Sequence, residues 1–195
     1  MAYGLLLLRV VVGLTVAGHG LQKLFGWFEG PGPEGTEQMF RKLGFPAAAA
    51  MAIMAALAET GGLLLALGLV TPLAALGMSI VMLNAIGSVH WRNGFWNSAG
   101  GYEFPLVVLA AVVSVATIGP GRFSLDRLIG WDGSISGLWW GVGVLAVAVA
   151  ISTLTLMTRR AGYVQPHEAS PSQEDADAPL SREAARDRAL ARQSR

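Results

Sequence analysis

The sequence contains no cysteine, and only 14% of its 195 residues are charged. The lack of cysteine excludes disulfides, CxxC redox motifs and thiolate metal sites within the chain. Any electron transfer therefore requires a bound cofactor or a partner. The formal net charge is +1, and the basic residues form no cluster of the kind that binds nucleic acid.

About half of the charged residues lie in a polar C-terminal tail. Seven of the 14 Lys and Arg residues and six of the 13 Asp and Glu residues follow Met157. The chain as a whole is 53% hydrophobic, with a mean hydropathy of +0.50, which is typical of membrane proteins. We therefore predict an integral membrane protein that contacts the lipid bilayer, with residues 158–195 as a mostly disordered tail.

Five apolar runs have the length, or nearly the length, of a membrane-spanning helix. A hydrocarbon core of about 30 Å needs roughly 20 helical residues at about 1.5 Å rise per residue. The predicted spans are residues 5–24, 46–69, 73–89, 104–118 and 138–157. The expected fold class is all-α, a polytopic transmembrane helical bundle.

Short features between and within the spans also carry structural predictions. Thr36 is placed to cap a short interfacial helix, and Thr71-Pro72 is a turn too short for anything but an antiparallel return. Ser124 is expected to cap a surface turn that has Asp126 near its N-terminus. Small residues that recur every four positions predict close helix packing in the second span: Ala48, Ala52 and Ala56, then Ala58, Gly62 and Ala66.

Alternation of the spans places loop 23–42, loop 90–102 and the tail on one face of the membrane. Arg122 and Arg127 lie near the opposite face, and Arg9 sits near the end of the first span that reaches it. Six basic residues lie near the first face: Lys23, Arg41, Lys42, Arg92, Arg159 and Arg160. The positive-inside rule therefore predicts a multi-pass protein of the cell membrane with a cytoplasmic tail.

Glu59 stands near the middle of the second apolar run, where a lipid-facing charge costs at least roughly 2.5–3.5 kcal/mol. It is therefore expected to face inward and to have a partner. Helix heights put Arg9 and His19 of the first span within its reach, and we predict a polar track from Arg9 through Glu59 to His19. The track is expected to open among His90, Trp91 and Glu103, which lie near the ends of neighbouring runs. Lys23, His90 and Glu103 are further candidate partners of Glu59.

Glu59, His19 and His90 are the candidate catalytic residues, because carboxylate and imidazole groups carry protons and imidazole also donates to a quinone carbonyl. The charged and aromatic groups around them are the candidate cofactor-binding residues: Arg9, Lys23, Glu103 and Trp91. A structural tie between Glu59 and Arg9, and ordinary interfacial roles for Glu103 and the tryptophans, stay open as alternatives. No spacing such as HExxH supports a metal site, so none is predicted.

Several motifs together resemble the DoxX family of small bacterial membrane proteins. They are Leu8-Arg9 with Gly13; His19-Gly20 with Lys23-Leu24; Phe40 with Leu43-Gly44-Phe45-Pro46; Glu59 with Gly61-Gly62; Leu67-Gly68-Leu69-Val70-Thr71-Pro72; His90; Glu103; and Gly119-Pro120-Gly121-Arg122-Phe123-Ser124-Leu125-Asp126. The resemblance covers roughly residues 4–130 and implies a four-helix membrane bundle over residues 1–130. Residues 131–157 then form an additional transmembrane helix outside the family core.

The resemblance also implies a link to redox chemistry. Some family members resemble subunits of a thiosulfate:quinone oxidoreductase, and others associate with a thiosulfate sulfurtransferase and superoxide dismutase in a membrane-bound oxidoreductase complex. The first expectation is therefore a quinone-associated or redox-complex membrane subunit, with its own enzymatic activity left open. The alternatives are a non-enzymatic scaffold that recruits soluble redox or sulfur-transfer enzymes, and a small-solute transporter that works as a homo-oligomer.

Overall fold

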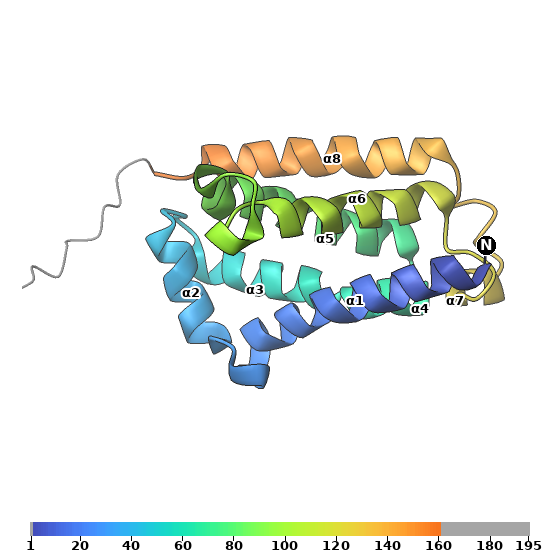
Figure 1. The fold of residues 1–195 in the computed structure, drawn as a ribbon, viewed down its shortest axis with the longest axis horizontal. Coiled ribbons are helices and arrows are strands. Elements are labelled where there is room, and N and C mark those ends of the chain that lie inside the picture. Colours follow the sequence, from blue (N-terminus) through green and yellow to red (C-terminus); the bar gives the residue numbers. More distant parts are fainter. Residues whose placement is uncertain (1, 161–195) are drawn as a thin grey trace, which may run out of the picture. The chain divides into compact units, whose positions relative to one another are not determined.

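Four helical segments are long and apolar enough to cross a membrane in the computed structural model, which describes residues 2–160. They are α1 (Ala2–Phe25), α3 (Ala48–Thr60) with α4 (Gly62–Leu67), α5 (Thr71–Ala85) with the turns that follow it, and α8 (Leu138–Met157). The shorter apolar helix α6 (Glu103–Ile118) lies among them (Figure 1). The predicted all-α transmembrane bundle is confirmed, whereas residues 161–195 of the predicted tail lie outside the described residues.

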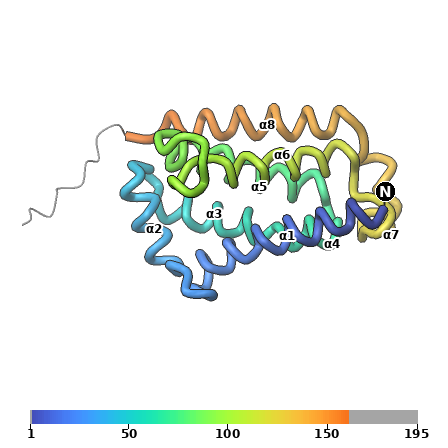
Figure 2. Tube along the Cα trace, viewed as in Figure 1, coloured from blue at the N-terminus to red at the C-terminus, as the bar shows by residue number. Residues whose placement is uncertain are grey.

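Short helices mark the two ends of the bundle. The interfacial helix α2 (Gly32–Lys42) lies at the same end as the C-terminal end of α8, which we call the α2 end (Figures 1 and 2). The chain N-terminus and α7 (Leu125–Leu128) lie at the opposite end, the α7 end. The remaining short turns are η1 (Trp27–Glu29), the π-helical turn η2 (Ile86–His90), η3 (Trp91–Asn93) and η4 (Asn97–Ala99).

Helix α2 begins four residues before the predicted cap. The Thr36 hydroxyl is buried inside the helix and donates to the Gly32 carbonyl oxygen at 2.6 Å. Pro33 explains the early start, because proline fits the first turn of a helix, where an N–H group has no partner to lose. The prediction of this helix is confirmed, but the prediction that Thr36 caps it is wrong.

The predicted span 46–69 consists of two helices in the structure. Helix α3 ends at Thr60, directly after Glu59, and α4 begins at Gly62. The Gly61 N–H still donates to the Leu57 carbonyl oxygen at 2.9 Å, so the chain keeps its direction through the break. Together the two helices retain the length of one membrane span.

Helix α1 packs against α3 and α4 with backbone against backbone. A methyl group added at Gly13 would overlap the carbonyl oxygen of Gly62, and one added at Gly62 would overlap that of Gly13. Gly20 is pressed in the same way against Thr60. Such close approach is how helices gain packing energy in lipid, where no hydrophobic effect drives them together. The predicted packing role of the small residues in the second span is confirmed here.

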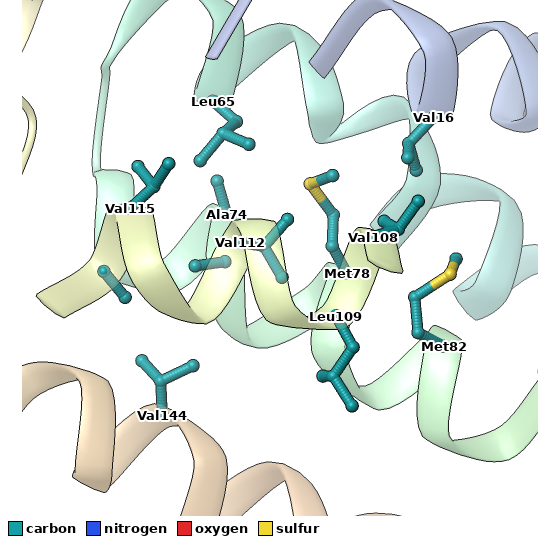
Figure 3. Packing of buried hydrophobic residues seen from close by; sticks show 12 residues of the cluster. Val16, Leu65, Ala74, Met78, Met82, Val108, Leu109, Val112, Val115 and Val144 are labelled. Atoms are coloured by element: carbon teal, nitrogen blue, oxygen red, sulfur yellow. The ribbon is translucent and has the colours of Figure 1, made fainter. Parts of the chain in front are cut away.

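The largest cluster of buried apolar side chains joins α1, α4, α5, α6 and α8 (Figure 3). Met78 of α5 and Val112 of α6 are fully buried at its centre. Val16, Leu65 and Val144 bring the other three helices into contact with them. Helix α8 thus shares its packing with the helices that precede it.

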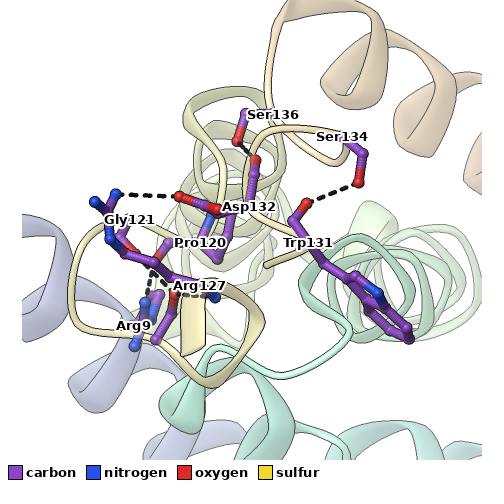
Figure 4. A network of polar contacts seen from close by, with 9 residues as sticks. Arg9, Pro120, Gly121, Arg127, Trp131, Asp132, Ser134 and Ser136 are labelled. Atoms are coloured by element: carbon purple, nitrogen blue, oxygen red, sulfur yellow. Dashed lines mark hydrogen bonds and ion pairs between the residues drawn. The ribbon is translucent and has the colours of Figure 1, made fainter. Parts of the chain in front are cut away.

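A buried arginine closes the α7 end of the bundle. Arg9 of α1 is only 1% exposed, and its guanidinium donates to the carbonyl oxygen of Pro120 (Figure 4). It also donates to the carbonyl oxygens of Phe123 at 2.6 Å and of Ala66 at 3.2 Å. The first two carbonyls belong to the loop after α6, where no helix supplies donors. Arg9 therefore ties this loop to α1 and α4.

Asp126 fixes the same end from the loop side. Its fully buried carboxylate accepts from the backbone N–H groups of Val70 and Thr71, at 2.7 and 2.9 Å, and from the Thr71 hydroxyl at 2.6 Å. These groups open α5, where the helix dipole also favours a negative charge. Val70 has a φ of 43°, which for a β-branched residue costs on the order of 1–3 kcal/mol. The Asp126 carboxylate holds it there.

We call this arrangement of Arg9, Asp126 and residues 66–71 and 119–126 the clamp. Within it, Ser124 caps α7 as predicted, since its hydroxyl oxygen accepts from the Arg127 N–H at 3.2 Å. Asp126, however, caps α5 and not only its own turn. The Asp126 N–H also donates to the Gly68 carbonyl oxygen at 2.8 Å, so the two segments are bonded in both directions.

The contact between α1 and α4 can be tested with Gly13→Ala. The added methyl group has no space beside the Gly62 carbonyl, so the variant is expected to lose about 1–3 kcal/mol of unfolding free energy in detergent micelles. Gly18→Ala in the same helix is the control, because nothing lies within 4 Å of its added methyl group. Equal midpoints of thermal unfolding for the two variants would contradict the packing described.

The clamp can be tested with Asp126→Ala. Loss of the carboxylate leaves the first N–H groups of α5 buried without acceptors, which is expected to cost about 2–5 kcal/mol of unfolding free energy. Asp132→Ala removes the carboxylate of a partly exposed ion pair with Arg127 and is expected to cost less than about 1 kcal/mol. Denaturant unfolding in micelles measures both, and a difference within error would show that Asp126 does not cap α5.

Candidate functional site

Glu59 is buried and paired with a cation, as its place in an apolar run requires. It is 4% exposed, and its Oε1 atom lies 2.5 Å from Nζ of Lys23. Glu59 lies in the last turn of α3 and Lys23 in the last turn of α1. The Lys23 side chain is 19% exposed, so it runs from the surface of the bundle to the buried carboxylate.

Arg9 and His19, the two partners of Glu59 predicted from helix heights, are bonded elsewhere. Lys23, named as a further candidate, forms the pair. Arg9 belongs to the clamp at the α7 end, and the exposed His19 has Nδ1 3.2 Å from Oε1 of Gln22. The His19 ring also packs edge-on against Phe104 of α6, with 5.9 Å between ring centroids. The predicted track from Arg9 through Glu59 to His19 is therefore wrong. Helix side chains lean toward the N-terminus, so it is Lys23, one turn beyond His19, that reaches Glu59.

Glu59 and Lys23 contribute to the wall of a cavity of about 340 Å³ among α2, α3, α5 and α8. Small-molecule sites typically have volumes of roughly 300–1,000 Å³ and apolar walls with a few converging polar groups. The other polar side chains of the lining are Asn84, Ser88 and Thr155. The larger apolar side chains are Met39, Phe40, Leu43, Met51, Met54, Ile80, Val81, Val89 and Ile151.

Two buried oxygen atoms of residues that line this cavity have no hydrogen-bond partner within the described part of the chain. They are Oε2 of Glu59 and Oδ1 of Asn84. The other polar atoms of both groups are used: Glu59 Oε1 accepts from Lys23, and Asn84 Nδ2 donates to the Ile80 carbonyl oxygen at 2.9 Å. An unsatisfied buried polar atom costs about 1–3 kcal/mol. Two residues of the cavity wall therefore each carry a buried acceptor that has no partner within residues 2–160.

The remaining predicted site residues gather in the loop between α5 and α6. His90 Nδ1 lies 2.7 Å from the Gly100 carbonyl oxygen, and Glu103 Oε2 accepts from the Asn97 N–H at 3.0 Å. Trp91 is exposed and stacks on Tyr102, with ring centroids 5.4 Å apart. These contacts order the loop, and none of the three predicted residues belongs to the lining of the cavity. Their roles in catalysis or cofactor binding remain predictions.

Three polar residues of the cavity were missed as site candidates in the sequence. Asn84 and Ser88 lie four positions apart across the start of the π-helical turn η2, which places both on one face of the helix. This spacing is a signal that the sequence does contain, and π-helical turns are frequent at functional sites. Thr155 lies in α8, beyond the residues that resemble a known family, and no motif marks it.

Comparison with known proteins supports the same family as the motifs. The DoxX family model matches residues 4–91, which include Lys23 and Glu59. The chain is 32% identical over 126 residues to "Putative oxidoreductase CatD" of Bacillus subtilis, covering 65% of this chain and 87% of CatD. It is 33% identical over 132 residues to "Uncharacterized membrane protein Rv3486" of Mycobacterium tuberculosis, covering 62% of this chain and 77% of that protein. No solved structure matches the chain.

The ion pair can be tested with Lys23→Met, which leaves the Glu59 carboxylate buried without its cation. The variant is expected to lose about 3–5 kcal/mol of unfolding free energy. The double variant Lys23→Met with Glu59→Leu removes both charges and is expected to regain most of that loss. Arg41→Met, which breaks the exposed pair with Glu37, is a control expected to cost less than about 1 kcal/mol. If the double variant is as unstable as Lys23→Met in micelle unfolding, the pair does not act as described.

Proposed function

Because the chain belongs to the DoxX family of membrane proteins, we propose that it is a membrane subunit of a redox complex that binds a quinone beside Glu59. The observation that carries the proposal is the buried Lys23–Glu59 pair in the wall of an apolar cavity of about 340 Å³. The word oxidoreductase in the name of the relative CatD supports the class of chemistry.

The cavity lining suits a quinone, which combines a polar ring with an apolar tail. Lys23 has three N–H donors and uses one for Glu59, so it can donate to a ring oxygen. Met39, Met51 and Met54 supply flexible thioethers, which pack favourably against aromatic rings. When bound, a quinone supplies the capacity to carry two electrons and two protons between proteins.

The side of the cavity gives a lipid-soluble molecule a route from the bilayer. Met54 of α3 and Met39 of α2 both line the cavity, and they are 66% and 38% exposed on the surface of the bundle. In a membrane this surface meets lipid, so an apolar tail that lies against Met39 and Met54 does not pass through water.

Glu59 and Lys23 would handle protons in this function. The unpartnered Oε2 atom of Glu59 is available to a bound molecule, and a carboxylate within hydrogen-bond distance can accept or return a proton. Lys23 joins that carboxylate to the partly exposed edge of the bundle, where protons exchange with water. Electrons would come from a soluble redox or sulfur-transfer partner, as the family resemblance implies.

Quinone binding can be tested with purified protein and ubiquinone-1, a soluble short-chain quinone. Ala85→Phe places a ring in the cavity and is expected to raise the Kd at least tenfold, as measured by isothermal titration calorimetry in mild detergent. Ala110→Phe, at an exposed position of α6 outside the cavity lining, is the matched control and is expected to bind like the unaltered protein.

If the unaltered protein binds neither ubiquinone-1 nor its reduced form, and retains neither a quinone nor a quinol during gentle purification, the proposed function is wrong. Recovery of soluble redox or sulfur-transfer enzymes with such a quinone-free protein would favour the scaffold alternative. Equal binding by Ala85→Phe and the unaltered protein would place the quinone outside this cavity and would also contradict the proposal.

A further inference from the structure

The polar atoms of the cavity-lining residues that have no partner within residues 2–160 are acceptors of hydrogen bonds. Oε2 of Glu59 belongs to a carboxylate that is paired with Lys23, so it accepts only. Oδ1 of Asn84 is the acceptor of the side-chain amide, and the hydrogen bond of the amide nitrogen Nδ2 fixes which way the amide points. That nitrogen faces the Ile80 carbonyl oxygen at 2.9 Å, which cannot donate, so the amide cannot be reversed without losing this bond.

The two hydroxyl groups of the lining have also used their donors. Ser88 donates to the Asn84 carbonyl oxygen at 2.6 Å, and Thr155 donates to the Ile151 carbonyl oxygen at 2.8 Å. Each hydroxyl has a single hydrogen, so what it can still offer to the cavity is a lone pair. The Asn84 amide uses its second N–H group on the Ser152 hydroxyl oxygen at 3.3 Å. Among the lining residues that the structure describes, Lys23 is thus the one side chain with N–H donors left over, and acceptors outnumber donors.

We propose that this cavity selects a head group that donates hydrogen bonds, and that it therefore binds the reduced quinol more tightly than the oxidised quinone. The two ring oxygens of a quinone accept only, so opposite Glu59 and Asn84 they would leave the protein oxygens unsatisfied. A quinol carries two O–H groups that can donate to such oxygens. This inference rests on the proposed function, because it takes a quinone as the class of ligand.

The expected preference is at least tenfold in Kd in favour of the quinol. Tighter binding of the reduced form makes reduction of the bound molecule more favourable, so the midpoint potential of the bound couple rises. For a two-electron couple, each tenfold preference corresponds to about 30 mV. The protein would thus hold its ligand mainly as the quinol at potentials where the free couple is half oxidised.

The test compares ubiquinone-1 with ubiquinol-1 on the unaltered full-length protein under anaerobic conditions, with both Kd values measured by isothermal titration calorimetry. A Kd at least tenfold lower for the quinol is the expected result. Equal affinities, or tighter binding of the quinone, would overturn this inference and leave the proposed function standing. Binding of neither form would instead overturn the proposed function.

Two variants test whether the preference for the quinol comes from the unpartnered oxygens of Glu59 and Asn84. Asn84→Leu and Glu59→Gln are each expected to weaken quinol binding at least threefold while quinone binding stays the same or becomes tighter. Asn97→Leu, at an exposed loop position outside the cavity lining, is the matched control and should change neither Kd. Equal weakening of both ligands by the two variants would contradict the role of the acceptors. If one variant fails to fold, the other and the ratio for the unaltered protein still decide.

Discussion

The structure depends on the buried guanidinium of Arg9, which lies against the non-helical loop that follows α6. Inside a membrane bundle, loop carbonyl groups have little access to water and need donors from the protein. Arg9 supplies them to the loop after α6, and Asp126 of that loop accepts the donors that open α5. Two side chains thereby fix α1, α4, α5 and the loop in one arrangement. The motifs at 67–72 and 119–126, which are far apart in the sequence, are two halves of this clamp.

The two buried carboxylates of the bundle show how a structural charge differs from a functional one. Both oxygens of Asp126 are occupied by donors of the protein, so its hydrogen-bonding capacity is spent on the fold. Glu59 is almost as deeply buried, but one of its oxygens is taken by Lys23 and the other is unpartnered within residues 2–160. Intramembrane charges are expensive and are commonly kept for function. Of the two, Glu59 is the carboxylate with capacity left for a ligand.

The positions of the long helices and the burial of Glu59 could be predicted from the sequence, because both follow from the cost of polar groups in lipid. The span predicted at 138–157 coincides with α8. Glu59 faces inward and pairs with a cation, as the cost of a lipid-facing charge requires. The identity of that cation was not predictable from helix heights alone, since His19 and Lys23 are one turn apart. Rotation of α1 and the lean of its side chains decide between them. The role of Asp126 was equally hidden, because its partners Val70 and Thr71 lie 56 and 55 residues away in the chain.

The unsatisfied oxygens of Glu59 and Asn84 would couple the stability of the bundle to the binding of the proposed ligand. In the ligand-free protein each costs about 1–3 kcal/mol, a large fraction of the stability of an ordinary domain. The clamp offsets part of this cost, because it supplies the α7 end with several buried hydrogen bonds, although Arg9 Nε is itself unpartnered within residues 2–160. The close packing of α1 against α4 also contributes to this offset. A ligand that donates to both oxygens removes the cost only in the folded state, so it must stabilise the fold as it binds. On the proposed function, the clamp would act indirectly, by keeping the bundle folded while polar groups at the opposite end have no partner within residues 2–160.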